Sequence, residues 1–122
     1  MNPTIIDFKP YVPAREFGVS KRFYLALGFA MSQGHGGTAD FELGGSRFRL
    51  QDYYVADWAN NFMLVMTVDD VEAWHRHVTA VLSDPLLASA RVAPIEAIDD
   101  ARVLHVHDPS GVLLIFVQRA AR

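Results

Sequence analysis

The stretch "VLHVHDPSGVLLIFVQ", residues 103–118, decides the fold. It contains the end of one apolar run, 101–107, and the whole of a second, 111–118, joined by the turn sequence Asp-Pro-Ser-Gly, and this pattern predicts a pair of strands. Successive side chains of a strand point to opposite faces, so His105 and His107 are expected on the same face. Two imidazoles at this spacing could reach one metal ion. The rest of the sequence must decide whether the hairpin is also a metal site.

The composition indicates one globular protein. The chain has 122 residues, of which 51% are hydrophobic and 20% charged, and no apolar run approaches the roughly 20 residues of a membrane span. The net charge of -3, with scattered Lys and Arg, argues against a nucleic-acid partner. The absence of cysteine excludes disulfides and thiolate ligands. The start "MNPTIIDFKP" does not resemble a signal peptide, so we expect a cytoplasmic protein.

The order of predicted elements is the same in both halves of the chain. Glu16 is expected at the start of the first helix and Gly28 at its end, while Asp69 or Asp70 caps the second helix. Pro10 cannot donate to a ladder, so the first strand should lie at an edge or contain a bulge. The first half is predicted to contain a strand at 4–12, a helix at 15–29 and strands at 29–33, 39–43 and 46–54. After a loop at 55–61, the second half should contain a strand at 62–68, a helix at 70–82 and strands at 92–98, 101–107 and 111–118.

This order is βαβββ, repeated. It predicts an α+β protein of a single domain, residues 1–122, with one module at about 1–60 and the other at about 61–122. No linker or low-complexity tract separates the halves, so we expect the two modules to share one architecture.

Three segments carry a resemblance to a known family: "FYLALGF" at 23–29, "ELGGSRFRLQD" at 42–52 and "DPSGVLLIFVQ" at 108–118. In this order the chain resembles the glyoxalase/bleomycin resistance/dioxygenase superfamily, also called vicinal oxygen chelate. The resemblance implies that eight strands form a partly closed, barrel-like sheet with two helices outside. It also implies a homodimer, because a second subunit commonly completes the fold.

The resemblance further implies where a metal would bind. Metal-dependent members take ligands from the first, fourth, fifth and eighth strands, and the matching positions here are Lys9, Arg49 or Gln51, Met63 and Ile115. A cation, a thioether and an alkyl group are poor ligands for a hard divalent ion, which leaves Gln51 alone. The resemblance therefore predicts no cofactor at the inherited site.

The pattern is similar to the metal-free bleomycin-resistance branch, in which a drug binds in a groove between subunits without reacting. The segment "KPYVPA", 9–14, is similar to the N-terminal strand that partners exchange in that branch. We expect an antibiotic-resistance type of protein that binds and sequesters a drug-like, aromatic or cationic small molecule, rather than an enzyme. The predicted ligand-binding residues are Lys9, Tyr11, Arg49, Gln51, Tyr53, Trp58, Met63, Val65, Thr67, Leu113 and Ile115.

Two alternatives stay open. One is a metal-dependent lyase, dioxygenase or thiol transferase with displaced ligands, for which His105, His107 and Gln51 are the candidates. The other is a non-catalytic structural or regulatory dimer. No serine lies in a recognisable nucleophile motif, so no catalytic residue is assigned. Asp108 is expected to cap the backbone of its turn rather than to bind a ligand.

Overall fold

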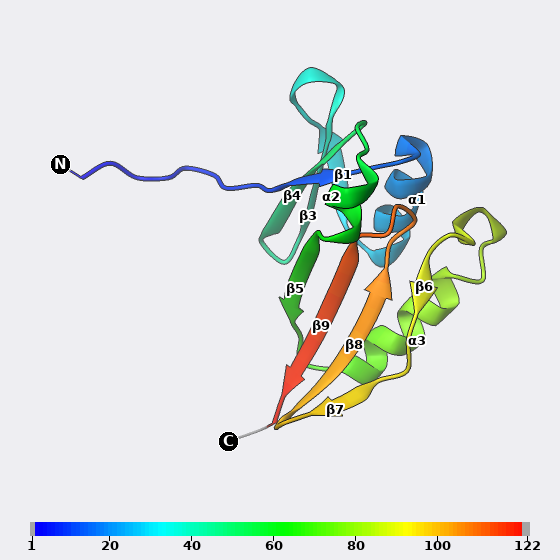
Figure 1. Cartoon of the computed structure of the whole chain (residues 1–122). Coiled ribbons are helices and arrows are strands. Elements are labelled where there is room, and N and C mark those ends of the chain that lie inside the picture. Colours follow the sequence, from blue (N-terminus) through cyan, green and yellow to red (C-terminus); the bar gives the residue numbers. More distant parts are fainter. Residues whose placement is uncertain (1, 121–122) are drawn as a thin grey trace.

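The computed structural model of the chain describes residues 2–120. Its elements form two sheets, one from each half of the chain (Figure 1). The first half contains β1 (Tyr11–Pro13), α1 (Phe17–Leu27), β2 (Ala30–Gln33), the 3-10 helix η1 (His35–Gly37), β3 (Ala39–Leu43) and β4 (Ser46–Gln51). The second half contains α2 (Ala56–Asn60), β5 (Met63–Thr67), α3 (Val71–Val81), the 3-10 helix η2 (Pro85–Leu87), β6 (Arg91–Val92), β7 (Glu96–Ile98), β8 (Ala101–His107) and β9 (Leu113–Arg119).

The first sheet has the order β1-β4-β3-β2, with β1 parallel to β4 and the other pairs antiparallel. Helix α1 begins after Glu16 and ends at Gly28, whose φ of 113° suits a residue without a Cβ. One stripe of the helix, which includes Phe23 and Tyr24, is buried. Tyr24 packs edge to face on Phe48 of β4, with ring centroids 4.7 Å apart. The helix therefore covers one face of this sheet and leaves the other for polar side chains.

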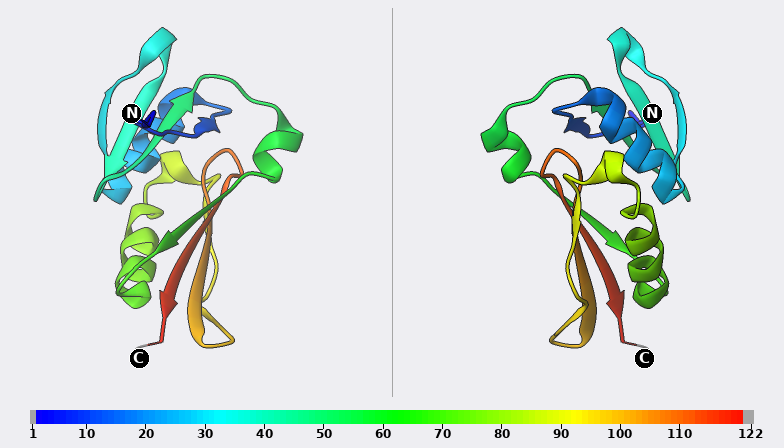
Figure 2. Two further views of the ribbon diagram at one scale, coloured as in Figure 1. Left: turned by 90° about the vertical axis from the view of Figure 1, so that its left-hand side faces the viewer. Right: turned by 90° about the vertical axis from the view of Figure 1, so that its right-hand side faces the viewer.

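The second sheet has the order β5-β9-β8-β6, and β7 pairs with the far end of β8. Asp70 caps α3 by accepting a hydrogen bond from the backbone N–H of Ala73. Trp74 of this helix stacks on Phe116 of β9 at 4.8 Å. Figure 2 shows that α3 lies along one face of the sheet only. The opposite face is therefore open in the single chain.

The α+β class and the doubled βαβββ order are confirmed. The described strands form two separate sheets of four and five strands, however, and do not close into a barrel. The expected loop at 55–61 contains the short helix α2, so the described residues form three α-helices rather than two. The expected strand at 92–98 is divided into β6 and β7 at Pro94, which has no N–H to donate to the ladder. No helix within residues 2–120 is long and apolar enough to cross a membrane.

The prediction of a strand at 4–12 is wrong for most of its length. Only Tyr11 and the residues after it pair with β4, and residues 2–10 form an arm that leads away from the body (Figure 1). The arm carries Ile5, Ile6 and Phe8, which are 79%, 98% and 76% exposed. Its apolar pattern is that of a strand, but no strand described within residues 2–120 pairs with it on the N-terminal side of Pro10.

The turn between β8 and β9 belongs to the second half of the protein and contacts the first half. Asp108 is buried and its Oδ1 accepts hydrogen bonds from the backbone N–H groups of Ser110 and Val112, at 2.8 and 3.0 Å. The predicted turn-capping role of Asp108 is thus confirmed. The Ser110 hydroxyl lies 3.1 Å from that of Ser20 on α1 and accepts from the N–H of Arg15 at 2.9 Å. The two contacts of Ser110 thereby attach the final hairpin to the first helix and to the residue just before its cap.

Candidate binding surface

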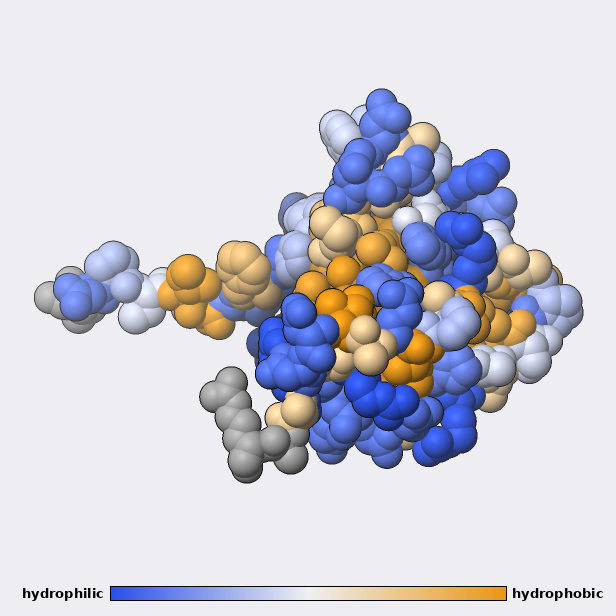
Figure 3. All heavy atoms as spheres, turned by 60° about the horizontal axis from the view of Figure 1, so that its bottom comes forward, coloured by the Kyte–Doolittle hydropathy of each residue, from blue (hydrophilic) through white to orange (hydrophobic). Residues whose placement is uncertain are grey.

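The open face of the second sheet carries exposed apolar side chains. Strand pairing sets Met63 beside Leu113 and Val65 beside Ile115, so these four side chains share one face. Their neighbours Leu64 and Leu114 point the other way, toward the core. Met63 and Val65 are 61% and 66% exposed. Figure 3 shows apolar side chains at the surface of the body, surrounded by polar ones, and along the arm.

The face of the first sheet that α1 leaves uncovered is polar, and its charged side chains form ion pairs with one another. Arg49 donates to both carboxylate oxygens of Asp40 on the neighbouring strand, at 2.7 and 3.0 Å. Its guanidinium also lies 5.8 Å from the ring centroid of Tyr11. The hydrogen bond from Arg49 lowers the pKa of Asp40, and the same bond raises the pKa of Arg49. Both groups therefore stay ionised at neutral pH and bind each other.

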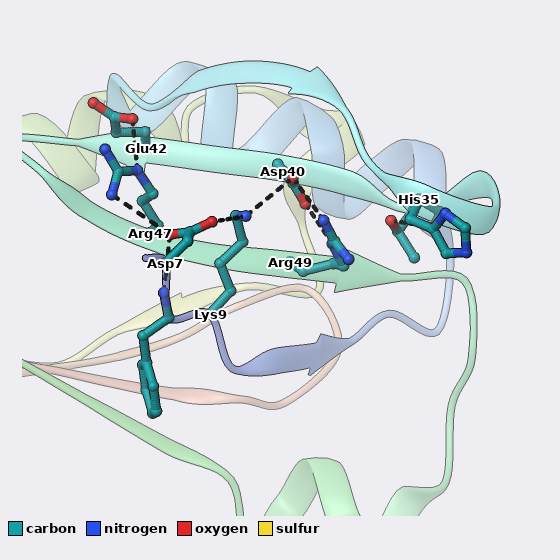
Figure 4. A network of polar contacts seen from close by, with 9 residues as sticks. Asp7, Lys9, His35, Asp40, Glu42, Arg47 and Arg49 are labelled. Carbon is teal, nitrogen blue, oxygen red and sulfur yellow. Dashed lines mark hydrogen bonds and ion pairs between the residues drawn. The ribbon is translucent and has the colours of Figure 1, made fainter. Parts of the chain in front are cut away.

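A second group of ion pairs holds the base of the arm (Figure 4). The Lys9 ammonium pairs with Asp7 and lies 3.6 Å from Asp40 Oδ2. Arg47 donates to Glu42 at 2.9 Å and lies 3.5 Å from Asp7. These residues line a cavity of about 420 Å³ on this face of the first sheet. Its three carboxylates are matched by three cations when Arg49 is included, so the surface has no net charge.

A smaller cavity of about 270 Å³ lies where the two sheets approach each other. Val65 and Thr67 line it from the second sheet, and Pro10 and Arg47 line it from the first half. It is the place where the structure brings predicted site residues of the second sheet near the arm. Aromatic side chains of the core, including Phe48, form part of its wall.

The aromatic residues between the modules form a separate pair. Tyr53 and Trp58 have ring centroids 5.8 Å apart and are 53% and 57% exposed. Trp58 lies on α2, and the backbone carbonyl of Tyr53 accepts from the N–H of Ala14. Neither side chain lines the two cavities described above.

The structure therefore separates five of the predicted site residues from the other six. Met63, Val65, Thr67, Leu113 and Ile115 share the open face of the second sheet. The remaining residues lie outside that sheet. These are Lys9 on the arm, Tyr11, Arg49 and Gln51 on the first sheet, and Tyr53 and Trp58 beyond its edge.

Sequence reasoning missed the carboxylates that neutralise the predicted cations. Asp40 and Glu42 stand directly opposite Arg49 and Arg47 in the β3–β4 register. The signal was present, because "ADFEL" and "SRFRL" alternate charged and apolar residues across a two-glycine turn. It also missed Arg91, which stands opposite His107. That pairing could not be read from the sequence because the break at Pro94 shifts the register.

At the metal positions that the resemblance implies, Gln51 alone has a side chain suited to a divalent ion. Lys9 and Arg49 are cations held in ion pairs, and Met63 and Ile115 offer no oxygen or nitrogen. The alternative set is also dispersed, since Gln51 is on the first sheet whereas His105 and His107 are on the second. Within residues 2–120, no three His, Cys, Asp or Glu side chains lie close enough together to hold a metal ion.

Comparison with solved structures defines the fold class. A bleomycin resistance determinant encoded on the transposon Tn5 matches with a TM-score of 0.76 and 21% identity, covering 96% of this chain and all of that one. A bleomycin-binding protein complexed with bleomycin matches at 0.73 and 21%, covering 94% and 99%. The lactoylglutathione lyase of Agrobacterium tumefaciens matches at 0.64 and 13%, covering 95% of each chain.

The chain therefore has the fold shared by bleomycin-resistance proteins and glyoxalases, as the sequence motifs predicted. An antibiotic-binding protein of Streptomyces sp. CB03234 has the same fold, with a TM-score of 0.72 and 19% identity over 97% of this chain and all of that one. Neither a protein-family model nor a curated protein matches the sequence significantly. At these identities the comparisons define architecture, and the function must be argued from the surfaces of this chain.

Proposed function

We propose that this protein is a metal-free binding protein that sequesters a small, drug-like aromatic molecule. The open apolar face of the second sheet is the observation that carries the proposal. Met63 and Val65 lie on a paired strand and yet remain more than half exposed. Covering apolar surface stabilises a complex by about 25 cal/mol per Å², so a flat apolar ligand gains free energy there. Three proteins with the same fold are described as binding bleomycin or an antibiotic, which supports this class of function.

We propose an aromatic rather than a cationic ligand because of the charges on the first sheet. Asp7, Asp40 and Glu42 are the carboxylates of that surface, and each is already paired with Lys or Arg. A cationic ligand would have to displace one of these partners before it gained a carboxylate. Aromatic rings need no such exchange, since they gain from apolar contact alone.

We also propose that a second copy of the chain completes the site. Ile5, Ile6 and Phe8 of the arm are apolar side chains that the described part of their own chain leaves largely uncovered. Exchange of arms between two copies would bury them and would place the ligand in a groove between the subunits. The ion pairs of Asp7 and Lys9 with the first sheet fix the direction in which the arm leaves the body.

The test is a calorimetric titration of untagged protein with bleomycin and with a panel of cytotoxic aromatic compounds. We expect saturable binding of at least one compound with a negative heat-capacity change, which marks apolar burial. No saturable binding across the panel would overturn the proposal in favour of a structural or regulatory dimer. Stoichiometric Zn, Ni, Mn or Fe in the purified protein, lost in His105→Ala, would support the metal-dependent alternative.

A further inference from the structure

The open face of the second sheet changes from basic side chains at one edge to apolar side chains at the other. Strand register places Arg91, His107, Leu113 and Met63 in one row across β6, β8, β9 and β5. The next row contains His105, Ile115 and Val65. Side chains in register across a sheet share a face, so one edge carries a guanidinium and two imidazoles and the other edge is apolar. Three interstrand steps separate Arg91 from Met63, or roughly 14 Å.

We infer that the ligand of the proposed function is an aromatic acid, whose rings lie on Met63, Val65 and Ile115 and whose anionic group binds at Arg91 and His107. This inference rests on the proposed function and specifies its ligand. The row is long enough for two or three fused rings with an acidic substituent at one end. A carboxylate, sulfonate or phosphate would serve equally, because each offers oxygen acceptors to the planar guanidinium.

The charges around the row support an anion. Arg91 is exposed and has no ion-pair partner within residues 2–120, in contrast to Arg47 and Arg49 on the first sheet. Neither imidazole has a hydrogen-bond partner within the described part of the chain. Burial, followed by the charges of Arg91 and His105, lowers the pKa of His107. A neutral His107 still has one ring N–H to donate to an acid group.

One carboxylate opposes this arrangement. Glu96 of β7 stands opposite Val103, two residues along β8 from His105, and therefore belongs to the same face. It is exposed and makes no ion pair within residues 2–120. Its negative charge should weaken the binding of an acid. Arg91 and Glu96 therefore offer two substitutions with opposite expected effects on the same ligand.

Two fluorescent probes with closely similar ring systems test the inference. Anilinonaphthalene sulfonate has an anionic group, and phenylnaphthylamine lacks it. We expect both to bind saturably, with the sulfonate about three- to tenfold tighter. Arg91→Gln should remove this preference and leave phenylnaphthylamine unchanged, whereas Glu96→Gln should increase the preference. Arg76→Gln is the matched control, because it changes the net charge equally at an exposed position on α3.

The outcomes separate the inference from the proposed function. If phenylnaphthylamine binds but the sulfonate binds no tighter, or if Arg91→Gln keeps the preference, the ligand is not an acid held at this edge. An equal loss in Arg91→Gln and Arg76→Gln would reveal only the effect of net charge and would also overturn the inference. If neither probe binds saturably, the proposed binding function itself fails.

Discussion

The hydroxyl of Tyr24 donates a 2.6 Å hydrogen bond to Oδ2 of Asp108, and both side chains are buried. Tyr24 lies on α1 in the first half of the chain, and Asp108 begins the turn between β8 and β9 in the second. Because Oδ1 of the same carboxylate accepts two backbone N–H groups of the turn, one side chain shapes the final hairpin and attaches it to the first helix. This contact therefore joins the hairpin that carries part of the open face to the first half of the chain.

Tyr24→Phe should destabilise the protein by about 1–3 kcal/mol, because it leaves a buried carboxylate without one of its donors. The measurement is the free energy of unfolding in urea. Tyr53→Phe, which removes a hydroxyl from an exposed ring, is the control and should change stability little. Equal effects of the two substitutions would contradict the assigned role of Tyr24.

The contribution of Asp108 to the stability of the folded protein should fall as pH rises. Burial raises the pKa of Asp108, although the bonds from Tyr24 and the turn act against this. The folded protein then holds the proton more tightly than the unfolded chain does. The carboxyl's contribution is therefore largest below its ordinary pKa of 3.8 and is lost as pH rises through the folded pKa. We expect the stability advantage of the wild type over Asp108→Asn to shrink as pH rises above the ordinary pKa of 3.8. An advantage that grew with pH would refute this assignment.

The contribution of Asp40 to stability should instead fall as pH decreases. The hydrogen bond from Arg49 lowers the pKa of Asp40, so the stabilisation is complete above the ordinary pKa of 3.8 and is lost as pH falls through the folded value. We expect the thermal midpoint of Asp40→Asn to respond less to acid than that of the wild type. Asp52→Asn, at an exposed position without an ion pair among the described residues, should behave like the wild type.

Ile6→Asp should weaken self-association, because it places a charge within the apolar part of the arm. Size-exclusion chromatography with light scattering measures the change, and we expect a shift from dimer toward monomer. Thr4→Asp adds the same charge at an exposed polar position of the arm and should leave the dimer intact. If the wild type is monomeric at all concentrations, the proposed exchange of arms is wrong.

Val65→Glu should abolish binding of phenylnaphthylamine and leave the fold intact, since the side chain is already largely exposed. Fluorescence titration reports the binding, and circular dichroism reports the fold. Leu86→Glu is the matched control, because Leu86 is 62% exposed on η2, away from the second sheet. Undiminished binding by Val65→Glu would show that the ligand binds elsewhere on the protein.

Local patterns were sufficient to predict most of the elements. Gly28 ends α1 because its left-handed backbone disfavours any side chain, and Asp70 caps α3 because its carboxylate reaches a backbone N–H three residues later. The alternation in 101–107 and 111–118 correctly predicted which side chains share a face. These features depend on neighbours a few residues apart, so the sequence alone determines them.

The tertiary structure decided features that the alternation of apolar and polar residues in the sequence could not predict. A strand pattern needs a partner, and residues 2–9 have none among the described strands, so they belong to an exposed arm. The ion pair of Arg49 with Asp40 and the row from Arg91 to Met63 depend on strand register, which joins residues distant in sequence. The sequence by itself therefore determined the order of elements and the apolar character of one face. Only the packing of α3 on a single side of the second sheet determined that this face is left uncovered.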